Sequence, residues 1–443
     1  MSNLIPSYQR SGRNVGVVHF GLGAFHRGHQ AVYFDSALRS GLGEWGIYGI
    51  SPRSSQVTDL LRAANFIYTV NARAGEVQSP SIIGSIFDGA LYDLNNPGLI
   101  AAITSPELKL LTVTVTEKAY VADDDSTSMA NRILDLLFLR FTRGLSAPTL
   151  ISCDNLTENG AVLKRALEES ARARELDRDF QTWVHSLSAP NSMVDRIVPA
   201  ITPAAIAQFE RDFGYYDSSL ISTEPFKQWV VQPHPGTPEL AKFGVEISDQ
   251  VLRFEQLKLR IFNGAHSTNA YFSQLSGLEF VYQAMAIPSW SDFIARLQDE
   301  VSESFTAPES VEVSEYASTA RARMANSAVA HRSAQIAMDG SAKLAQRLFS
   351  VANLLHDVGK PRMRVAFAIA LWIRFLQSGL PVTDPLADQL ITRARNTDDR
   401  EAVRLVMQTP GLLNSVNPED CAQIAEFVTE LRKFTPLDIA KTL

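Results

Sequence analysis

The chain has 443 residues, 45% of them hydrophobic and 20% charged, so it has room for two or three domains with buried cores. Its net charge of −7 without a basic stripe argues against a nucleic-acid partner. Cys153 and Cys421 are the only cysteines, too few for a disulfide framework or a thiolate metal site. Neither a signal-peptide pattern nor an apolar run of membrane-spanning length occurs, so we expect a cytoplasmic protein without a membrane partner.

The first half of the chain alternates between strand and helix patterns. Val15–Phe20 is an apolar, valine-rich run that ends at a glycine, which predicts a buried parallel strand, and a helical pattern follows over His29–Ser40. Phe66–Tyr92 is rich in β-formers and turn residues and predicts a small antiparallel insertion. Further strands are predicted at Gly46–Ser51, Leu108–Thr116 and Thr149–Cys153. This rhythm is typical of a doubly wound, mainly parallel sheet.

The pattern changes from about Glu246, where long helical segments dominate and strand patterns become rare. We therefore predict an α/β fold with a Rossmann-like N-terminal domain, residues 1–245, and a mainly α-helical C-terminal domain, residues 246–443. The active site is expected in the cleft between them, because pockets often form at domain boundaries.

A glycine-rich turn follows the first predicted strand. Gly21, Leu22, Gly23, Ala24 and Phe25 follow the strand directly, and a Gly-x-Gly turn there lets the backbone approach a pyrophosphate. The usual third glycine position holds a histidine, so the fingerprint is incomplete. The same pattern is also compatible with a tight turn that binds nothing.

The end of the second predicted strand bears on the choice between NAD and NADP. An acid there would bind the ribose 2′-hydroxyl, whereas this chain has Arg53 between serines. An arginine can pair with a 2′-phosphate, although an incidental surface arginine is an equal alternative. Both NAD and NADP therefore remain open as cofactors, with a preference for NADP or dual use.

Three polar residues lie close together in the helical pattern Val251–Leu275. On an α-helix, Lys258, Asn263 and His266 fall at about 0°, 140° and 80° around the axis, so all three can face one pocket. Their burial on an otherwise apolar face requires polar partners. A half-exposed helix with scattered polar residues is the alternative.

These segments together resemble the polyol-specific long-chain dehydrogenase/reductase family, also called the mannitol dehydrogenase family. The matching stretches, in order, are Gly21–Gln30, Thr114–Lys118, Ser152–Asn155, Pro190–Ile197, Lys258–His266 and Asp339–Lys343. The resemblance implies a metal-independent oxidoreductase in which Lys258 is the general acid or base. Desolvation beside a cationic cofactor ring makes a lysine easier to deprotonate, which agrees with that role.

The resemblance also implies roles for residues outside the Lys258 helix. Asn191 and Asn263 correspond to amides that stabilise the reacting oxygen, and His266 to a histidine that orients a substrate hydroxyl. Glu117 corresponds to a glutamate on a proton path, with a surface ion pair as the alternative. Asn155, after the Thr149–Cys153 strand, is assigned to cofactor binding.

The region around Asp339 looks more like the fructuronate reductase branch of the family than the mannitol branch. Arg332 and Lys343 can supply the positive charge that the carboxylate of a sugar acid requires, although each can also be a helix-surface cation. We predict reduction of D-fructuronate to D-mannonate, with a mannitol 2-dehydrogenase-type reaction as the alternative. The partner is then a small sugar acid or polyol, and the oligomeric state stays open.

Two readings from other classes compete with this prediction. The His356-Asp357 pair is compatible with a metal-dependent phosphohydrolase, but a helix-ending pair without further ligands explains it more simply. A nucleotide-binding regulator without catalysis is the second, and the complete set of Lys258, Asn191 and Asn263 argues against it.

Overall fold

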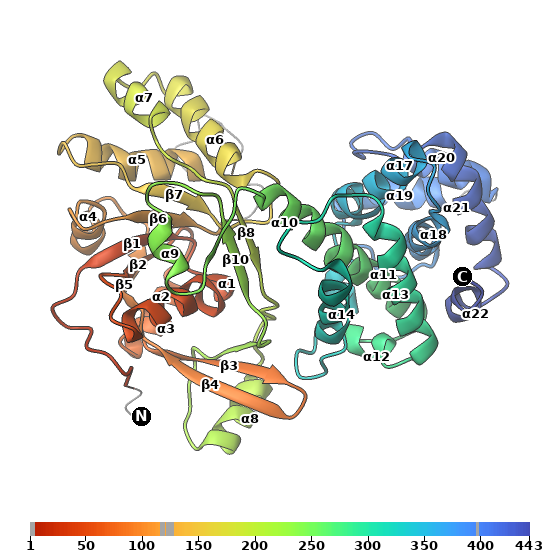
Figure 1. The fold of residues 1–443 in the computed structure, drawn as a ribbon, viewed down its shortest axis with the longest axis horizontal. Coiled ribbons are helices and arrows are strands. Elements are labelled where there is room, and N and C mark those ends of the chain that lie inside the picture. The colour runs from red at the N-terminus through yellow and green to blue at the C-terminus, as the bar shows by residue number, and fades with distance from the viewer. Residues whose placement is uncertain (1–4, 116–119, 121–127, 396–397) are drawn as a thin grey trace. The chain divides into compact units, whose positions relative to one another are not determined.

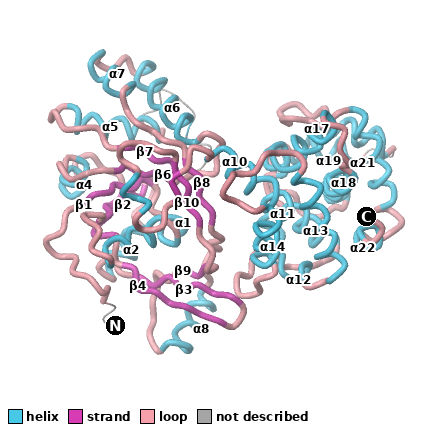
Figure 2. Tube along the Cα trace, viewed as in Figure 1, coloured by secondary structure: helices cyan, strands magenta, loops and turns pink. Residues whose placement is uncertain are grey.

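The computed structural model describes residues 5–115, 120, 128–395 and 398–443. The chain forms two compact units, unit 1 (Met1–Leu252) and unit 2 (Arg253–Leu443). The named strands all belong to unit 1, while helices dominate unit 2 in the part of the chain that the structure describes (Figures 1 and 2). Both predictions of fold class, a Rossmann-like sheet followed by a helical region, are confirmed.

The main sheet of unit 1 has five parallel strands. Its order is β5 (Ile86–Leu91), β2 (Gly46–Ser51), β1 (Val15–Phe20), β6 (Leu110–Val113) and β7 (Thr149–Ser152). The order reverses direction at β1, and ligands of such sheets bind beyond the carboxyl ends of the strands at this position. The turn after β1 therefore lies at the expected place for a dinucleotide.

Helices cover both faces of this sheet because successive residues of a strand point to opposite sides. In β1, Val18 packs into a core with the helices α4 to α7, whereas Val17 packs into a second core with α2 and α3 (Figure 1). The helices of unit 1 are α1 (Ala24–Gly28), α2 (Gln30–Arg39), α3 (Gln56–Ala63), α4 (Pro97–Ile103), α5 (Met129–Phe141), α6 (Asn159–Ala173), α7 (Arg178–His185), α8 (Pro203–Phe213) and α9 (Pro238–Ala241).

Two smaller sheets complete unit 1. One has the order β4 (Val77–Ile83), β3 (Tyr68–Ala74) and β9 (Ile221–Thr223), and the other β11 (Glu246–Ile247), β10 (Gln228–Val231) and β8 (Ser192–Asp195). The antiparallel insertion expected over Phe66–Tyr92 is the β3–β4 hairpin, but β5 in the same stretch joins the main sheet in parallel. Local composition does not distinguish these pairings, since the choice of neighbouring strand is made in tertiary packing.

Unit 2 is a helical assembly around α18 (Met363–Gln377). Nine consecutive residues of α18, from Val365 to Ile373, are apolar and buried, and a helix that is apolar all round must lie inside a domain. It contacts α11 (Ala265–Leu275), α13 (Pro288–Ser302) and α21 (Pro418–Glu430). The other helices are α10 (Val251–Leu257), α12 (Val281–Met285), α14 (Val313–Met324), α15 (Ser333–Ile336), α16 (Gly340–Leu344), α17 (Ser350–Asp357), α19 (Ala387–Ala394), α20 (Asp399–Met407) and α22 (Pro436–Ala440).

Two segments of unit 2 are π-helical, namely η2 (Lys258–Gly264) and η3 (Ala345–Phe349), and they contact each other. Gly264 makes this contact close, because a Cβ atom there would lie 3.1 Å from the Arg347 carbonyl oxygen. Among the described helices, none is long and apolar enough to cross a membrane.

Candidate active site

The turn after β1 is shaped by backbone contacts. Gly21 has φ +107°, and a Cβ atom there would lie 2.0 Å from the Thr114 carbonyl oxygen, so only glycine fits. Its N–H and that of Leu22 both donate to the Ile50 carbonyl oxygen, at 2.9 and 3.1 Å. Gly23 is the N-cap of α1. A Cβ atom on Gly23 would have the Gly21 carbonyl oxygen as its nearest neighbour, at 3.7 Å. The turn is therefore fixed by the strand contacts of Gly21 and Leu22, while the space next to Gly23 stays open, as close approach of a phosphate requires.

The accessible edge of this turn is its second half. Gly21 and Leu22 are buried, whereas Gly23, Ala24 and Phe25 are half-buried. Phe25 stacks on His29, with ring centroids 5.1 Å apart.

His26 occupies the position where the usual fingerprint has its third glycine. Its imidazole is fully buried and stacks on His19 of β1, with centroids 3.4 Å apart and 13° between the rings. His19 Nδ1 is 2.8 Å from Thr112 Oγ1, and its Nε2 is 2.9 Å from Thr114 Oγ1 and 3.1 Å from the Gly21 carbonyl oxygen. Burial lowers the pKa of His19 to about 3, so it is a neutral ring that supports the turn from inside.

Arg53 is exposed in the loop between β2 and α3. A second arginine, Arg132 of α5, donates to the Pro52 carbonyl oxygen of the same loop and lies 5.0 Å from the centre of the Tyr92 ring. The sequence contained no signal for Arg132, because it is 80 residues away from Pro52, which it contacts. Asn155 is exposed and follows Asp154, shortly after the end of β7.

Asn191 is held in one orientation by the start of α6. Its Oδ1 accepts from the backbone N–H of Ala161 at 3.1 Å, so its Nδ2 is the end that remains as a donor. Gly160 makes this possible, because a Cβ atom there would lie 2.4 Å from the Ala189 carbonyl oxygen and 2.5 Å from that of Pro190. A larger residue at position 160 would push the Asn191 segment away from the helix.

Asn159 connects the strand ends around that segment. Its buried amide donates to the carbonyl oxygens of Ser152, Asp154 and Ser192, and accepts from the Ser192 N–H at 2.9 Å. Sequence reasoning did not select Asn159 or Gly160. An Asn-Gly pair that opens a helix soon after a parallel strand was the available signal.

In unit 2, the helix that carries Lys258 is π-helical at this point. In a π-helix the backbone bonds join residues i and i+5, so Asn263 lies about one turn beyond Lys258 on the same side. An α-helix would have separated the two by about 140°. Lys258 is only 7% exposed, and Asn263 is half-buried. The buried Gln298 of α13 donates to the Ile261 carbonyl oxygen at 3.1 Å and so satisfies part of the backbone in this segment.

His266 is buried one turn further along and faces a second imidazole. Its ring centroid is 5.2 Å from that of His331 and 5.3 Å from that of Phe262. Burial, followed by the neighbouring His331 and then the positive charges of Arg347, Arg323 and Lys343, holds the pKa of His266 well below its usual value. The imidazole of His266 is therefore neutral.

The cations near this histidine pair come from three helical segments. Lys343 of α16 donates to the Met338 carbonyl oxygen at 2.7 Å, and Arg347 of η3 donates to Ser267 Oγ at 2.9 Å. Arg323 of α14 is buried, and its guanidinium lies 4.0 Å from the centre of the Phe262 ring. The structure thus brings Lys343 into the surroundings of His266, together with two arginines that sequence reasoning missed.

Arg332 lies elsewhere, on the surface of unit 2. Its side chain is 65% exposed and forms a 2.8 Å ion pair with Glu279. Its guanidinium also lies 5.7 Å from the centre of the Phe280 ring. This arrangement is that of the helix-surface cation weighed above. The remaining assigned residue, Glu117, lies outside the described residues.

Family models match both halves of the chain. One, the mannitol dehydrogenase Rossmann domain, matches residues 15–242, and the other, the mannitol dehydrogenase C-terminal domain, matches residues 250–432. The chain belongs to the mannitol dehydrogenase family of oxidoreductases. This confirms the family resemblance stated from the motifs.

Several relatives of this family member cover nearly its whole length. D-mannonate oxidoreductase of Escherichia coli (strain K12) is 32% identical to it, over 96% of this chain and 93% of the relative. A mannitol 2-dehydrogenase of Aspergillus fumigatus is 31% identical, over 88% of this chain and 85% of the relative. The solved ternary complex of Pseudomonas fluorescens mannitol 2-dehydrogenase with NAD and D-mannitol matches 99% of this chain and 95% of its own, with a TM-score of 0.85 and 28% identity.

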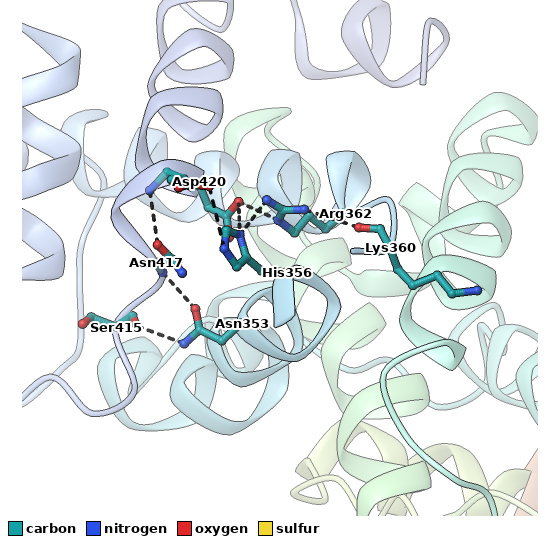
Figure 3. Close-up of polar contacts among 8 residues, drawn as sticks. Asn353, His356, Lys360, Arg362, Ser415, Asn417 and Asp420 are labelled. Atoms are coloured by element: carbon teal, nitrogen blue, oxygen red, sulfur yellow. Dashed lines mark hydrogen bonds and ion pairs between the residues drawn. The ribbon is translucent and has the colours of Figure 1, made fainter. Parts of the chain in front are cut away.

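The His356 region of this family member has a cation where a metal ion would be needed (Figure 3). Arg362 Nε donates to Asp420 Oδ1 at 2.6 Å, and its Nη2 lies 2.8 Å from His356 Nδ1. His356 Nε2 is 3.7 Å from a carboxylate oxygen of Glu419. A guanidinium thus pairs with His356, one of the two residues that the phosphohydrolase reading named, and the cluster joins α17 to α21.

Proposed function

We propose that this oxidoreductase interconverts a keto sugar acid and its hydroxy acid with a nicotinamide cofactor, and that the pair is D-fructuronate and D-mannonate. The observation that carries the proposal is the charge around His266, where the strongest ionic influences after burial come from cationic or imidazole groups. Three cations near His266, of which Arg323 is buried and Lys343 and Arg347 are half-buried, favour a substrate that brings a negative charge, because the attraction offsets part of the cost of their desolvation. The similarity to a D-mannonate oxidoreductase supports the same substrate.

The residues of the turn after β1 fit a dinucleotide. The N–H groups of Gly21, Leu22 and Gly23 donate to backbone carbonyl oxygens of the protein. Within the turn Gly21 to Phe25, the backbone N–H groups at the start of α1 would therefore hold the pyrophosphate, since the space above Gly23 is open. Arg53 and Asn155 follow strands β2 and β7 of the same sheet edge. Bound reduced cofactor supplies the hydride for carbonyl reduction. NAD is supported by the ternary complex of the Pseudomonas fluorescens relative, while Arg53 keeps NADP as a second possibility.

The polar residues of this chain would manage the proton and the oxygen. In reduction, the keto carbon gains a hydride and the keto oxygen gains a proton, so one C=O bond becomes H–C–O–H. Lys258 donates that proton from its ammonium group and takes it back in the oxidation direction. Asn263, one turn away, and Asn191, with its Nδ2 available, donate to the oxygen as negative charge develops on it.

His266 has a different role in this scheme. Because it is neutral, its ring can donate through one nitrogen and accept through the other, which suits a substrate hydroxyl. Glu117 stays a proposal for proton exchange with Lys258, whereas the exposure of Arg332 and its ion pair with Glu279 do not favour a substrate contact for that residue.

The proposal is tested by following nicotinamide absorbance with fructuronate or fructose, each with NADH or NADPH. Oxidation with fructuronate alone is the expected result. Oxidation with fructose alone would assign the chain to mannitol 2-dehydrogenase chemistry, which the similarity to the Pseudomonas fluorescens enzyme favours as second candidate. No oxidation with either sugar would contradict both.

Lys343→Ala and Arg332→Ala form a matched pair for the substrate carboxylate. Since Lys343 lies near the buried histidines and Arg332 is 65% exposed, we expect Lys343→Ala to lower selectivity for fructuronate over fructose about tenfold or more. Arg332→Ala should change it less than threefold. Unchanged selectivity in both variants would count against a carboxylate site here.

A further inference from the structure

The imidazole that faces the buried His266 belongs to His331, which is half-buried and has no role in the scheme above. It lies 5.2 Å from His266 between ring centroids, in the stretch that precedes α15. Its Nδ1 is buried and has no hydrogen-bond partner among the described residues. Buried polar atoms of proteins are nearly always bonded, so an exception calls for a specific explanation.

The backbone of His331 is held firmly, so the open nitrogen does not reflect a loose loop. Its N–H donates to the Val329 carbonyl oxygen at 2.7 Å, and its own carbonyl oxygen accepts from Val281 at 3.1 Å. The following residue, Arg332, forms an antiparallel bridge with Phe280. These contacts fix the direction in which the imidazole projects.

The chemistry beside this nitrogen is that of an anion site. After burial, the positive charge of Lys343 lowers the pKa of His331, and it also contributes to the lowered pKa of His266. The two imidazole rings and Lys343 therefore lie in one neighbourhood, although they come from three different segments of unit 2. A neutral imidazole there can donate one N–H to an oxygen of an incoming anion without adding a further buried charge.

We propose that His331 is a substrate-binding residue that determines specificity, and that its Nδ1 donates a hydrogen bond to the carboxylate of the sugar acid beside Lys343. This inference rests on the proposed function, because it assumes that the substrate enters next to His266. In the bound state the buried nitrogen gains the partner that the protein alone does not provide. In this arrangement Lys343 attracts the carboxylate by its positive charge, and the hydrogen bond from His331 orients it.

The test compares His331→Leu, which removes the hydrogen bond, with His331→Asn, whose amide can place a donor near the position of Nδ1. His185→Asn, at a histidine whose side chain is 79% exposed, is the matched control. For fructuronate reduction with saturating cofactor, we expect His331→Leu to raise KM at least tenfold while kcat stays within threefold. His331→Asn should recover part of that loss, and the control should match wild type.

Two results would overturn the inference. One is a folded His331→Leu enzyme whose KM for fructuronate stays within twofold of wild type. The other is a parallel loss of kcat, KM and thermal midpoint that His331→Asn does not relieve, which would make His331 a structural residue. If His331→Leu does not fold, the same criteria apply to His331→Asn, for which a KM within twofold of wild type would overturn the inference.

The design separates this inference from the proposed substrate. If wild type reduces fructose but not fructuronate, the proposed substrate and the carboxylate contact are both wrong. If wild type reduces neither sugar, D-mannonate is titrated calorimetrically into the enzyme with NAD. Binding that His331→Leu weakens tenfold would support the inference, and absence of binding by wild type would overturn it together with the proposed function.

Discussion

Each unit holds a histidine next to the residues that we assign to its function, namely the buried His19 in unit 1 and the half-buried His331 in unit 2, and the two differ in their hydrogen-bond partners. His19 of unit 1 has contacts of 2.8 to 3.1 Å at both ring nitrogens, all to groups of the protein. His331 of unit 2 has a buried Nδ1 without a partner among the described residues. Burial lowers the pKa of both. A lowered pKa is therefore common to the two histidines, and the partners of their ring nitrogens differ.

The same contrast extends to the surroundings of the two histidines. The turn beside His19 is shaped by backbone atoms, with Gly21 against the Thr114 carbonyl oxygen. The neighbourhood of His331 is made of side chains from separate helices, including Lys343. We therefore expect changes in unit 1 to act first on folding and cofactor binding, and changes in unit 2 to act first on turnover and substrate.

The largest effect is expected for Lys258→Ala. Loss of a general acid costs about 10²- to 10⁴-fold in turnover, while folding and cofactor affinity should change little, because the substitution removes only the amine and its stem. The measurements are kcat and the cofactor dissociation constant. Lys360→Ala, at a half-exposed lysine paired with Glu303, is the control and should keep wild-type kcat. A near-normal rate in Lys258→Ala would contradict the mechanism.

The next effect is expected for Gly21→Ala in unit 1. A side chain there meets both a positive φ of +107° and the Thr114 carbonyl oxygen, so we expect about 3 kcal/mol or more of lost unfolding free energy and weaker cofactor binding. Gly41→Ala is the matched control, since Gly41 has φ +66° and nothing within 4 Å, and should cost about 1 kcal/mol. Equal losses in denaturant unfolding would show that the contact with Thr114 is unimportant.

The free energy of unfolding over a series of pH values compares His331 of unit 2 with His19 of unit 1. The pKa of His331 is about 4 in the folded protein, below the value of about 6.5 for an unfolded chain. Between these values the unfolded state binds a proton that the folded state excludes, so stability falls as the pH drops from about 6.5 to about 4. Relative to His331→Asn, wild type should lose up to ~3 kcal/mol across this window. For His19, with a folded pKa of about 3, the loss should continue to lower pH.

Denaturant unfolding at pH 7.5, 6, 5 and 4 provides this measurement. A difference between wild type and His331→Asn that stays constant over the series would contradict the prediction. It would mean that His331 binds its proton equally well in both states.

The smallest effect is expected from chelation. Arg362 pairs with His356, the imidazole that the competing metal reading needs, and with the neighbouring Asp420, so EDTA should leave the rate of cofactor oxidation unchanged. If EDTA abolished the activity and a divalent cation restored it, the result would support the hypothesis of a metal site at His356. It would then count against the metal-independent mechanism.

Some features of this protein follow from local sequence. The valine-rich strand at Val15–Phe20 and its glycine turn were predictable, because burial on both faces and a positive φ leave a direct signature in residue type. The change to helices after Glu246 was predictable from periodicity alone. The family followed from six short motifs in a fixed order, and both family models agree with it.

Other features depend on contacts between distant segments. The π-helical geometry that places Asn263 on the side of Lys258 is supported by Gln298, and no local pattern in the sequence announces it. Asn191 is oriented by Ala161, which lies 30 residues earlier in the chain.

The sequence by itself therefore determined the fold class, the family and the residues that can carry hydride-transfer chemistry. Tertiary structure alone decided which cations gather around His266, and that His331 faces them with an unpaired nitrogen while Arg332, its neighbour in the chain, lies at the surface. The physical reason is that residue type sets what a side chain can do. Its charge environment and its hydrogen-bond partners are set by segments that meet only when the chain is folded.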